Sequence, residues 1–265
     1  MLFRARIVWV AQRFLIPVCG VLVAIGITTA LDAHGLTAFS ALPLLPLFVL
    51  FALAERLPVP TIGFVLGRAR DYAIAAAYPA IVLGVVGILG FIAGGAHLDR
   101  AHIQKAALDF VIIAIATAIV ALVTEEGFFR GWLWASLNKR GASTGVALTS
   151  TSVAFAAWHL SYATLAKGYT LPLLQVGIFI ANAAVIGAIW GLMRAMSASI
   201  VVSSVSHALW NGAAYAFFGE GPKSGPLGLP NTIVWGPEVG IAGLGANVLF
   251  LAALYFFDAR RVRLE

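Results

Sequence analysis

Long apolar runs separated by short polar segments dominate the chain. A helix that crosses the roughly 30 Å hydrocarbon core of a bilayer needs about 20 mostly apolar residues. Eight runs meet or approach that length, at residues 14–31, 36–54, 72–96, 108–126, 144–166, 171–193, 197–218 and 240–257. Strict alternation of apolar and polar residues, the pattern of membrane β-barrel strands, is absent from these runs. We therefore predict an all-α, polytopic transmembrane bundle of about eight spans.

The composition excludes several other classes of protein. Of the 265 residues, 61% are hydrophobic and 11% are charged, whereas soluble domains average roughly 45–50% and about 25%. These fractions exclude a soluble globule and a disordered chain. The net charge of +6 comes without a basic cluster interleaved with aromatic residues, so we expect no nucleic-acid partner. A single domain over residues 1–265 accounts for the chain.

The distribution of Lys and Arg predicts the orientation. If the amino terminus lies inside, the segments on that side carry twelve Lys and Arg and the opposite segments carry four. Cytoplasmic loops are enriched in Lys and Arg. We therefore expect both termini in the cytoplasm and an integral, multi-pass membrane protein, located in the plasma (inner) membrane if the source is bacterial.

Two adjacent carboxylates and an arginine continue the fourth apolar run. A helix over residues 108–137 would be about 45 Å long, so Glu125, Glu126 and Arg130 would lie within it rather than in water. Glu126 and Arg130 are four residues apart and share a helix face, which suits an ion pair. Glu125 is rotated by about 100° and faces another neighbour. A purely structural juxtamembrane pair remains an alternative for Glu126 and Arg130.

Two later spans each carry a histidine. His159 follows Phe155 by four residues in the fifth run, and His207 precedes Asn211 by four in the seventh, so each pair shares a helix face. Taken singly, each histidine is explained by hydrogen bonding between helices.

Together, these polar side chains indicate chemistry. Ionisable groups inside a span cost several kcal/mol, and here they occur on three spans. A desolvated carboxylate and a nearby imidazole are what general acid–base catalysis on water requires. His207 and Asn211 can supply donors to a developing oxyanion. The set therefore favours hydrolysis of an amide bond.

These motifs, in this order, resemble those of the CPBP family, which comprises type II CAAX prenyl endopeptidases and bacteriocin-processing or immunity proteins. The motifs are Glu125-Glu126-x-x-x-Arg130, Phe155-x-x-x-His159 and His207-x-x-x-Asn211, and the resemblance covers residues 108–218, the expected catalytic core. It implies an intramembrane endopeptidase whose cavity is accessible from the cytoplasm and from lipid. The activities that the resemblance implies include CAAX-type carboxy-terminal processing.

The resemblance also implies a role for each motif residue. Glu125 is the general base that activates water, assisted by His159, and His207 and Asn211 are the oxyanion donors. Glu126 and Arg130 form a supporting pair. The expected partners are a peptide or protein substrate, including lipidated ones, and membrane lipids.

The family is often labelled as metalloproteases, so zinc has to be considered. Glu125, His159 and His207 offer Zn²⁺ three ligands, which is the usual number in a catalytic site. The His-Glu-x-x-His signature of zinc peptidases is absent from the sequence. We therefore expect no metal and no other cofactor, and keep zinc as the alternative.

Two other functions remain open. A non-catalytic membrane scaffold or bacteriocin immunity protein would retain the polar cluster for helix packing. A proton-coupled transporter would use Glu125 as a proton relay.

Overall fold

The computed structural model describes residues 13–93, 95–220 and 225–262, and these contain helices and no strands. The helices are α2 (Leu15–Ala33), α3 (Leu44–Ala54), α4 (Val59–Ile62), α5 (Ala69–Ile92), α6 (Ile103–Val123), α7 (Trp134–Lys139), α8 (Thr144–Trp158), α9 (Leu160–Leu165), α10 (Leu173–Ser197), α11 (Ile200–Ala213), α12 (Thr232–Trp235) and α13 (Ile241–Val262). Three further elements are the 3₁₀-helix η1 (Thr37–Phe39) and the π-helices η2 (Glu126–Leu133) and η3 (Ala214–Phe218). The predicted all-α class is confirmed.

The chain is an integral, multi-pass membrane protein. Within the described residues, six helical segments are long and apolar enough to span a bilayer: Leu15–Ala33, Thr37–Ala54, Ala69–Ile92, Ile103–Lys139, Leu173–Ser197 and Ile241–Asp258. The other two predicted spans also run through the bundle, but their helices are interrupted. Residues 144–166 divide into α8 and α9 at His159, and α11 passes into the π-helix η3.

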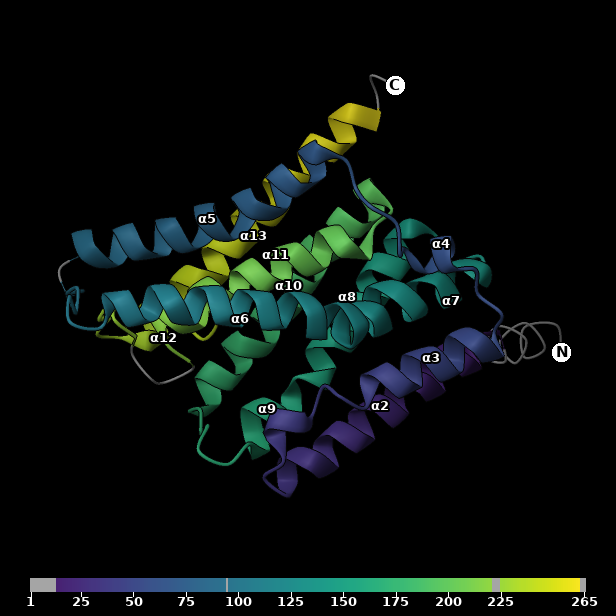
Figure 1. The fold of residues 1–265 in the computed structure, drawn as a ribbon, viewed down its shortest axis with the longest axis horizontal. Helices are drawn as coiled ribbons and strands as arrows, with labels where there is room; N and C mark the ends of the chain where they lie inside the picture. Colours follow the sequence, from purple (N-terminus) through teal and green to yellow (C-terminus); the bar gives the residue numbers. More distant parts are fainter. Residues whose placement is uncertain (1–12, 94, 221–224, 263–265) are drawn as a thin grey trace, which may run out of the picture.

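Hydrogen bonds between connecting segments define two ends of the bundle. At one end, the Ser199 hydroxyl donates to the Val65 carbonyl, and Lys139 donates to the Glu55 carbonyl. At the other end, the backbone N–H of Asp99 donates to the Pro226 carbonyl. We call the first the terminus end, because α2 begins and α13 ends there, and the second the loop end (Figure 1).

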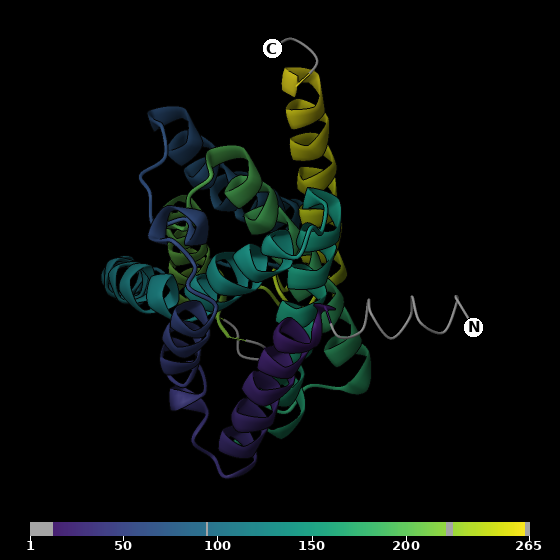
Figure 2. The ribbon, with the colours of Figure 1, turned by 90° about the vertical axis from the view of Figure 1, so that its right-hand side faces the viewer.

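The loop end holds the connections at 34–43, 93–102, 166–172 and 219–240. Figure 2, which faces the terminus end, shows α2 and α3 along one edge of the bundle and α13 along the opposite edge. Of the cations used for the predicted orientation, Arg4, Arg6, Lys223 and Arg263 lie outside the described residues, as do the side chains of Arg260 and Arg261.

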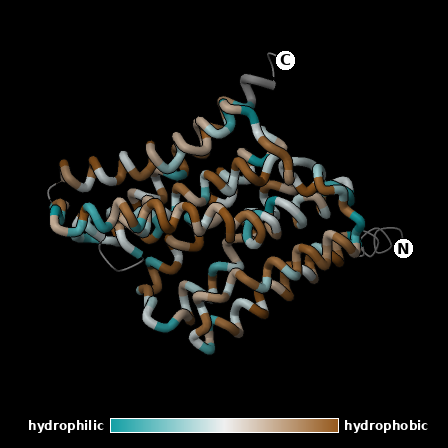
Figure 3. Tube along the Cα trace, viewed as in Figure 1, coloured by the Kyte–Doolittle hydropathy of each residue, from teal (hydrophilic) through white to brown (hydrophobic). Residues whose placement is uncertain are grey.

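The outer helices expose apolar side chains where lipid is expected. Large side chains on α2, α3, α5 and α6 are mostly solvent-accessible in the isolated chain, including Leu22, Leu53, Ile92 and Ile119. Figure 3 shows many hydrophobic residues along these helices. Cys19, on α2, is also exposed. Because these faces have no partner helix among the described residues, acyl chains are their natural neighbours.

Helices α6 and α11 cross closely, and a glycine makes this possible. A Cβ atom added at Gly212 would lie 3.0 Å from the Ala114 Cβ and 3.0 Å from the Phe110 carbonyl oxygen. Small residues allow membrane helices to approach in this way. The contact matters for the site because α6 leads into Glu125 and α11 carries His207.

We predict that Gly212→Val destabilises the protein by about 1–3 kcal/mol, since the added methyl groups overpack the α6–α11 contact. Thermal unfolding in detergent measures the loss. The matched control is Gly177→Val on α10, where nothing lies within 4 Å of an added Cβ. Equal melting temperatures for the two variants would show that the close approach contributes nothing.

Candidate active site

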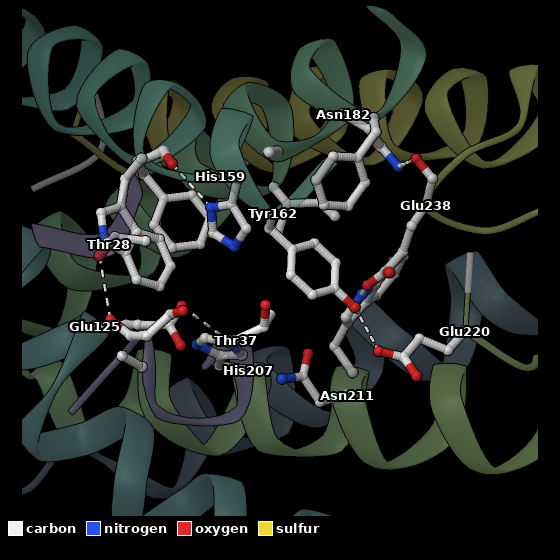
Figure 4. Close-up of a pocket in the computed structure, with 18 of the residues that line it drawn as sticks. Thr28, Thr37, Glu125, His159, Tyr162, Asn182, His207, Asn211, Glu220 and Glu238 are labelled. Atoms are coloured by element: carbon white, nitrogen blue, oxygen red, sulfur yellow. Dashed lines mark hydrogen bonds and ion pairs between the residues drawn. The ribbon is translucent and has the colours of Figure 1, made fainter. Parts of the chain in front are cut away.

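The four residues predicted to do the chemistry line one cavity. Its volume is about 440 Å³, and Glu125, His159, His207 and Asn211 all contribute to its wall. They come from the α6–η2 junction, the α8–α9 junction and α11. Figure 4 shows these side chains around the same hollow. The structure therefore brings together residues that are up to 86 positions apart in the sequence.

The two adjacent carboxylates, at the start of a π-helix, lie in different surroundings. Helix α6 ends at Val123, and the wider turns of η2 begin at Glu126, so residues 108–137 are not the single α-helix expected from the sequence. The Glu125 side chain is 15% exposed and borders the cavity, whereas Glu126 is fully buried. Short π-helical segments are rare and often occur at functional sites.

The ion pair that the spacing predicts is present, deep in the protein. An Nη1 atom of Arg130 lies 3.3 Å from Glu126 Oε1, and both side chains are fully buried. Glu126 Oε2 also accepts a hydrogen bond of 2.7 Å from the Ser203 hydroxyl. A buried charge is tolerated only when it is paired and hydrogen-bonded, and Glu126 meets both conditions.

Aromatic rings and one carbonyl hold the arginine. The guanidinium carbon of Arg130 lies 4.2 Å from the centroid of the Phe155 ring and 5.4 Å from that of Trp190. Its Nη2 donates to the Gly187 carbonyl at 3.2 Å. Cation–π contacts of this kind strengthen when the cation is removed from water. Phe155 of the predicted Phe-x-x-x-His motif therefore contacts Arg130 as well as His159.

Glu126 also orients His207. The Nδ1 atom of His207 lies 3.2 Å from Glu126 Oε1, so Nδ1 donates to this carboxylate. The imidazole stacks on the Trp190 indole, with centroids 4.0 Å apart and an interplanar angle of 20°. Its other nitrogen, Nε2, lies 3.9 Å from Glu125 Oε2. A carboxylate on one ring nitrogen fixes which nitrogen faces the reaction site.

His159 is oriented by a backbone carbonyl. Its Nδ1 lies 2.9 Å from the Phe155 carbonyl oxygen and donates to it. The ring meets Phe155, Trp158 and Phe179 edge-on. With its proton on Nδ1, neutral His159 has a lone pair on Nε2. The two imidazoles of the cavity are thus held by different acceptors: a carboxylate holds His207, and an uncharged carbonyl holds His159.

Sequence reasoning missed several polar residues in and around this cavity. Ser203 precedes His207 by four residues, so helical spacing offered a signal for its contact with Glu126. Asp32 offered less, because it lies near the end of a predicted span; it is fully buried and accepts hydrogen bonds from the hydroxyls of Ser40 at 2.5 Å and Ser161 at 2.7 Å. These bonds tie the α2–α3 connection to α9.

Two further glutamates, Glu220 and Glu238, line the same cavity. The Trp210 indole N–H donates to Glu238 Oε1 at 3.0 Å, and the Tyr162 hydroxyl donates to Glu220. Burial raises the pKa of Glu238 to about 7. Both glutamates belong to the 219–240 connection. Their spacing from the histidine motifs gave no signal in the sequence, so their contacts with Trp210 and Tyr162 were not predicted.

The described side chains do not form an evident metal site. Within residues 13–93, 95–220 and 225–262, no group of three or more His, Cys, Asp or Glu has a geometry that could hold a metal ion. The Nδ1 atoms of both imidazoles are engaged by Glu126 and by the Phe155 carbonyl. The three predicted zinc ligands line one cavity but do not converge as a ligand set in this conformation.

A family comparison covers this part of the chain. Residues 107–213 match the family model described as "Rce1-like: Type II CAAX prenyl endopeptidase Rce1-like". This match agrees with the family resemblance that the sequence motifs carry. No curated protein matches the chain.

The Rce1-like segment contains all the motif residues and leaves part of the cavity wall outside. The family is one of membrane endopeptidases, so its members act on peptide or protein substrates. Glu125, His159, His207 and Asn211 fall within residues 107–213. The wall is completed by residues before and after the segment, namely Thr28, Asp32, Thr37, Ala38, Ser40, Ala41, Tyr215, Glu220 and Glu238.

We predict that Glu126→Gln destabilises the protein by about 3–5 kcal/mol, because it leaves the Arg130 charge buried without a counter-ion. Unfolding in detergent, followed by circular dichroism, measures this loss. The control is Asp109→Asn, which removes the partner of Lys105 in a more exposed pair of the same i,i+4 spacing and costs at most about 1 kcal/mol. Wild-type stability in Glu126→Gln would contradict the structural role of the pair.

Proposed function

We propose that the protein is an intramembrane endopeptidase in which Glu125 activates a water molecule for attack on a peptide bond. The observation that carries the proposal is the cavity shared by Glu125, His159, His207 and Asn211, with Glu126 and Arg130 buried behind it. A cluster made only for helix packing has no need of a hollow of about 440 Å³ at its centre. The scaffold and transporter alternatives have no comparable support.

The Glu125–His207 geometry suits a reaction on water. Their closest side-chain atoms are 3.9 Å apart, which is too long for a direct hydrogen bond and short enough for an oxygen atom to bridge them. Glu125 takes a proton from that water as the water oxygen attacks the carbonyl carbon. The same carboxyl group then delivers the proton to the departing amine nitrogen.

Donors on α11 oppose the developing negative charge. Because Nδ1 of His207 is bound to Glu126, Nε2 is the nitrogen directed toward Glu125, and when protonated it donates to the oxyanion. The Asn211 amide borders the same cavity one helical turn later. Preorganised donors in a site with little water stabilise such charge by several kcal/mol.

His159 serves the reaction from the other wall. With Nδ1 donating to the Phe155 carbonyl, Nε2 accepts a hydrogen bond from the attacking water and helps to align it with Glu125. The aromatic rings around His159 restrict its rotation. The substrate is a peptide or protein segment, lipidated or not, that reaches the cavity within the membrane.

We predict that Glu125→Gln lowers peptide cleavage by about 10²–10⁴-fold, the usual contribution of a general base. Purified variants in detergent are compared on a panel of lipidated and unlipidated peptides by mass spectrometry. The melting temperature should remain near that of the wild type, because Glu125 borders the cavity and carries no ion pair shorter than 3.9 Å among the described residues. Asp109→Asn, on the preceding helix α6, is the control for a carboxylate lost elsewhere. Full activity in Glu125→Gln would disprove the proposal.

We further predict that metal chelators leave cleavage unchanged, since the proposed mechanism uses a carboxylate and two imidazoles without a metal ion. The purified protein is incubated with a chelator, dialysed and assayed with the best peptide of the panel. Loss of activity that Zn²⁺ restores would instead establish a zinc enzyme with Glu125, His159 and His207 as the first ligands to test.

A further inference from the structure

Glu238 lines the cavity but has no part in the proposed reaction. It belongs to the 219–240 connection, outside the segment that matches the family, and its side chain is partly exposed (Figure 4). The Asn182 amide holds the backbone here, donating to the carbonyls of Pro237 at 2.8 Å and Glu238 at 3.1 Å. Gln175 adds a hydrogen bond of 3.4 Å to the Val239 carbonyl. These bonds fix the position from which the carboxyl group borders the cavity.

The carboxyl group of Glu238 lacks a counter-ion. The Trp210 indole N–H donates to its Oε1 at 3.0 Å. Among the residues that the structure describes, no Lys, Arg or His forms an ion pair with it. Burial disfavours the charged form and raises the pKa of Glu238 to about 7. An arriving cation would supply the missing counter-ion and form a charge-assisted hydrogen bond with the carboxylate.

The surroundings of Glu238 suit a positively charged group. The rings of Tyr162, Trp210 and Tyr215 line the same cavity, and aromatic faces attract cations. The acidic side chains of the lining are Asp32, Glu125, Glu220 and Glu238, and no described Lys or Arg belongs to it. A basic side chain of a substrate therefore meets opposite charges and aromatic rings, whereas an acidic one meets like charges.

The position of Glu238 along α11 places this contact close to the reacting groups. Its donor, Trp210, follows His207 by three residues, so the two side chains share a helix face about 4.5 Å apart along the axis. An extended peptide advances about 3.3–3.6 Å per residue. The substrate residue that reaches Glu238 thus lies within about three positions of the cleaved bond.

We propose that Glu238 determines specificity by binding a Lys or Arg side chain of the substrate. The ammonium or guanidinium group donates to Oε2 of the carboxylate, while Trp210 keeps its bond to Oε1. The aromatic rings of the lining pack against the alkyl stem of the basic side chain. This subsite rests on the proposed peptidase function and names its substrate class: peptides with a basic residue near the cleaved bond.

Paired peptides test the subsite. Each pair carries lysine or its uncharged analogue norleucine at one position, scanned over three residues on either side of the cleaved bond. At one position, lysine is expected to raise kcat/KM by about tenfold or more, mainly through KM. Glu238→Gln, which keeps an acceptor for Trp210 but no charge, is expected to abolish this preference. The matched control is Glu220→Gln in the same connection, where the exposed carboxylate contributes less than about fivefold. The same preference in wild type and Glu238→Gln would overturn the proposal.

The pH dependence of the wild type gives a test without a variant. The carboxyl group must be ionised to bind the cation, so the lysine preference is present above pH 7 and is lost as the pH falls through about 7. The other titratable groups that face Glu238 are Glu220 of its own connection, His207 of α11, Tyr215 of η3, Tyr162 of α9, Tyr169 of the 166–172 connection and Tyr78 of α5. Dividing the two kcat/KM values of a pair cancels the ionisation of His207 and of Glu125, because both peptides meet the same free enzyme. A ratio that stays constant between about pH 5.5 and 8.5 would contradict the subsite.

A binding measurement distinguishes the subsite from the peptidase activity. Isothermal titration calorimetry in detergent compares the lysine and norleucine peptides on Glu125→Gln, which is expected not to cleave them. The lysine peptide should bind about tenfold or more tightly than its partner, and the double variant Glu125→Gln/Glu238→Gln should bind both equally. If the lysine preference is found but the wild type cleaves no peptide, the peptidase proposal fails and the subsite stands. If peptides are cleaved but bind equally with lysine or norleucine, the subsite is disproved and the peptidase stands.

Discussion

A buried ion pair constrains every other part of the candidate site. Glu126 and Arg130 have no access to solvent, and in a membrane-embedded core their desolvation is compensated only if each finds further partners. Those partners are Ser203, His207, the Gly187 carbonyl and the face of Phe155. Each lies on α8, α10 or α11, so satisfying one pair of charges fixes three helices around η2. The position and tautomer of His207 follow directly from this requirement.

The adjacent glutamates at the start of the π-helix have different surroundings. Glu126 faces the core and is held by three polar groups, whereas Glu125 borders the cavity and its ion pair with His207 spans 3.9 Å. A carboxylate that is already satisfied is a poor base, and one without strong partners remains available for a proton. The proposed division into a structural and a chemical carboxylate thus follows the different surroundings of the two side chains, and the Arg194 guanidinium donates to the Arg130 carbonyl within η2.

The sequence predicted those features that depend on local periodicity. Helical spacing paired Glu126 with Arg130 and placed His207 and Asn211 on one wall, because residues four apart share a face whatever the tertiary structure. It did not predict the π-helix, whose Glu126 and Arg130 side chains are held by Ser203 and Gly187 on other helices. Nor could it assign Asp32, since a carboxylate near the end of a span looks solvated until Ser40 and Ser161 are brought to it. Long-range pairing has no signature in a single sequence.

The matched segment is therefore not sufficient to form the site. Residues 107–213 supply the motif side chains, yet one wall consists of the end of α2 and the α2–α3 connection. Hydrogen bonds of Asp32 hold this wall, as does the Trp158 indole, which donates to the Thr28 hydroxyl at 2.7 Å. Without this wall, Glu125 and His159 would face lipid or bulk water, and neither provides oriented partners for a reacting peptide. The amino-terminal helices thus complete the wall that turns a polar cluster into a cavity.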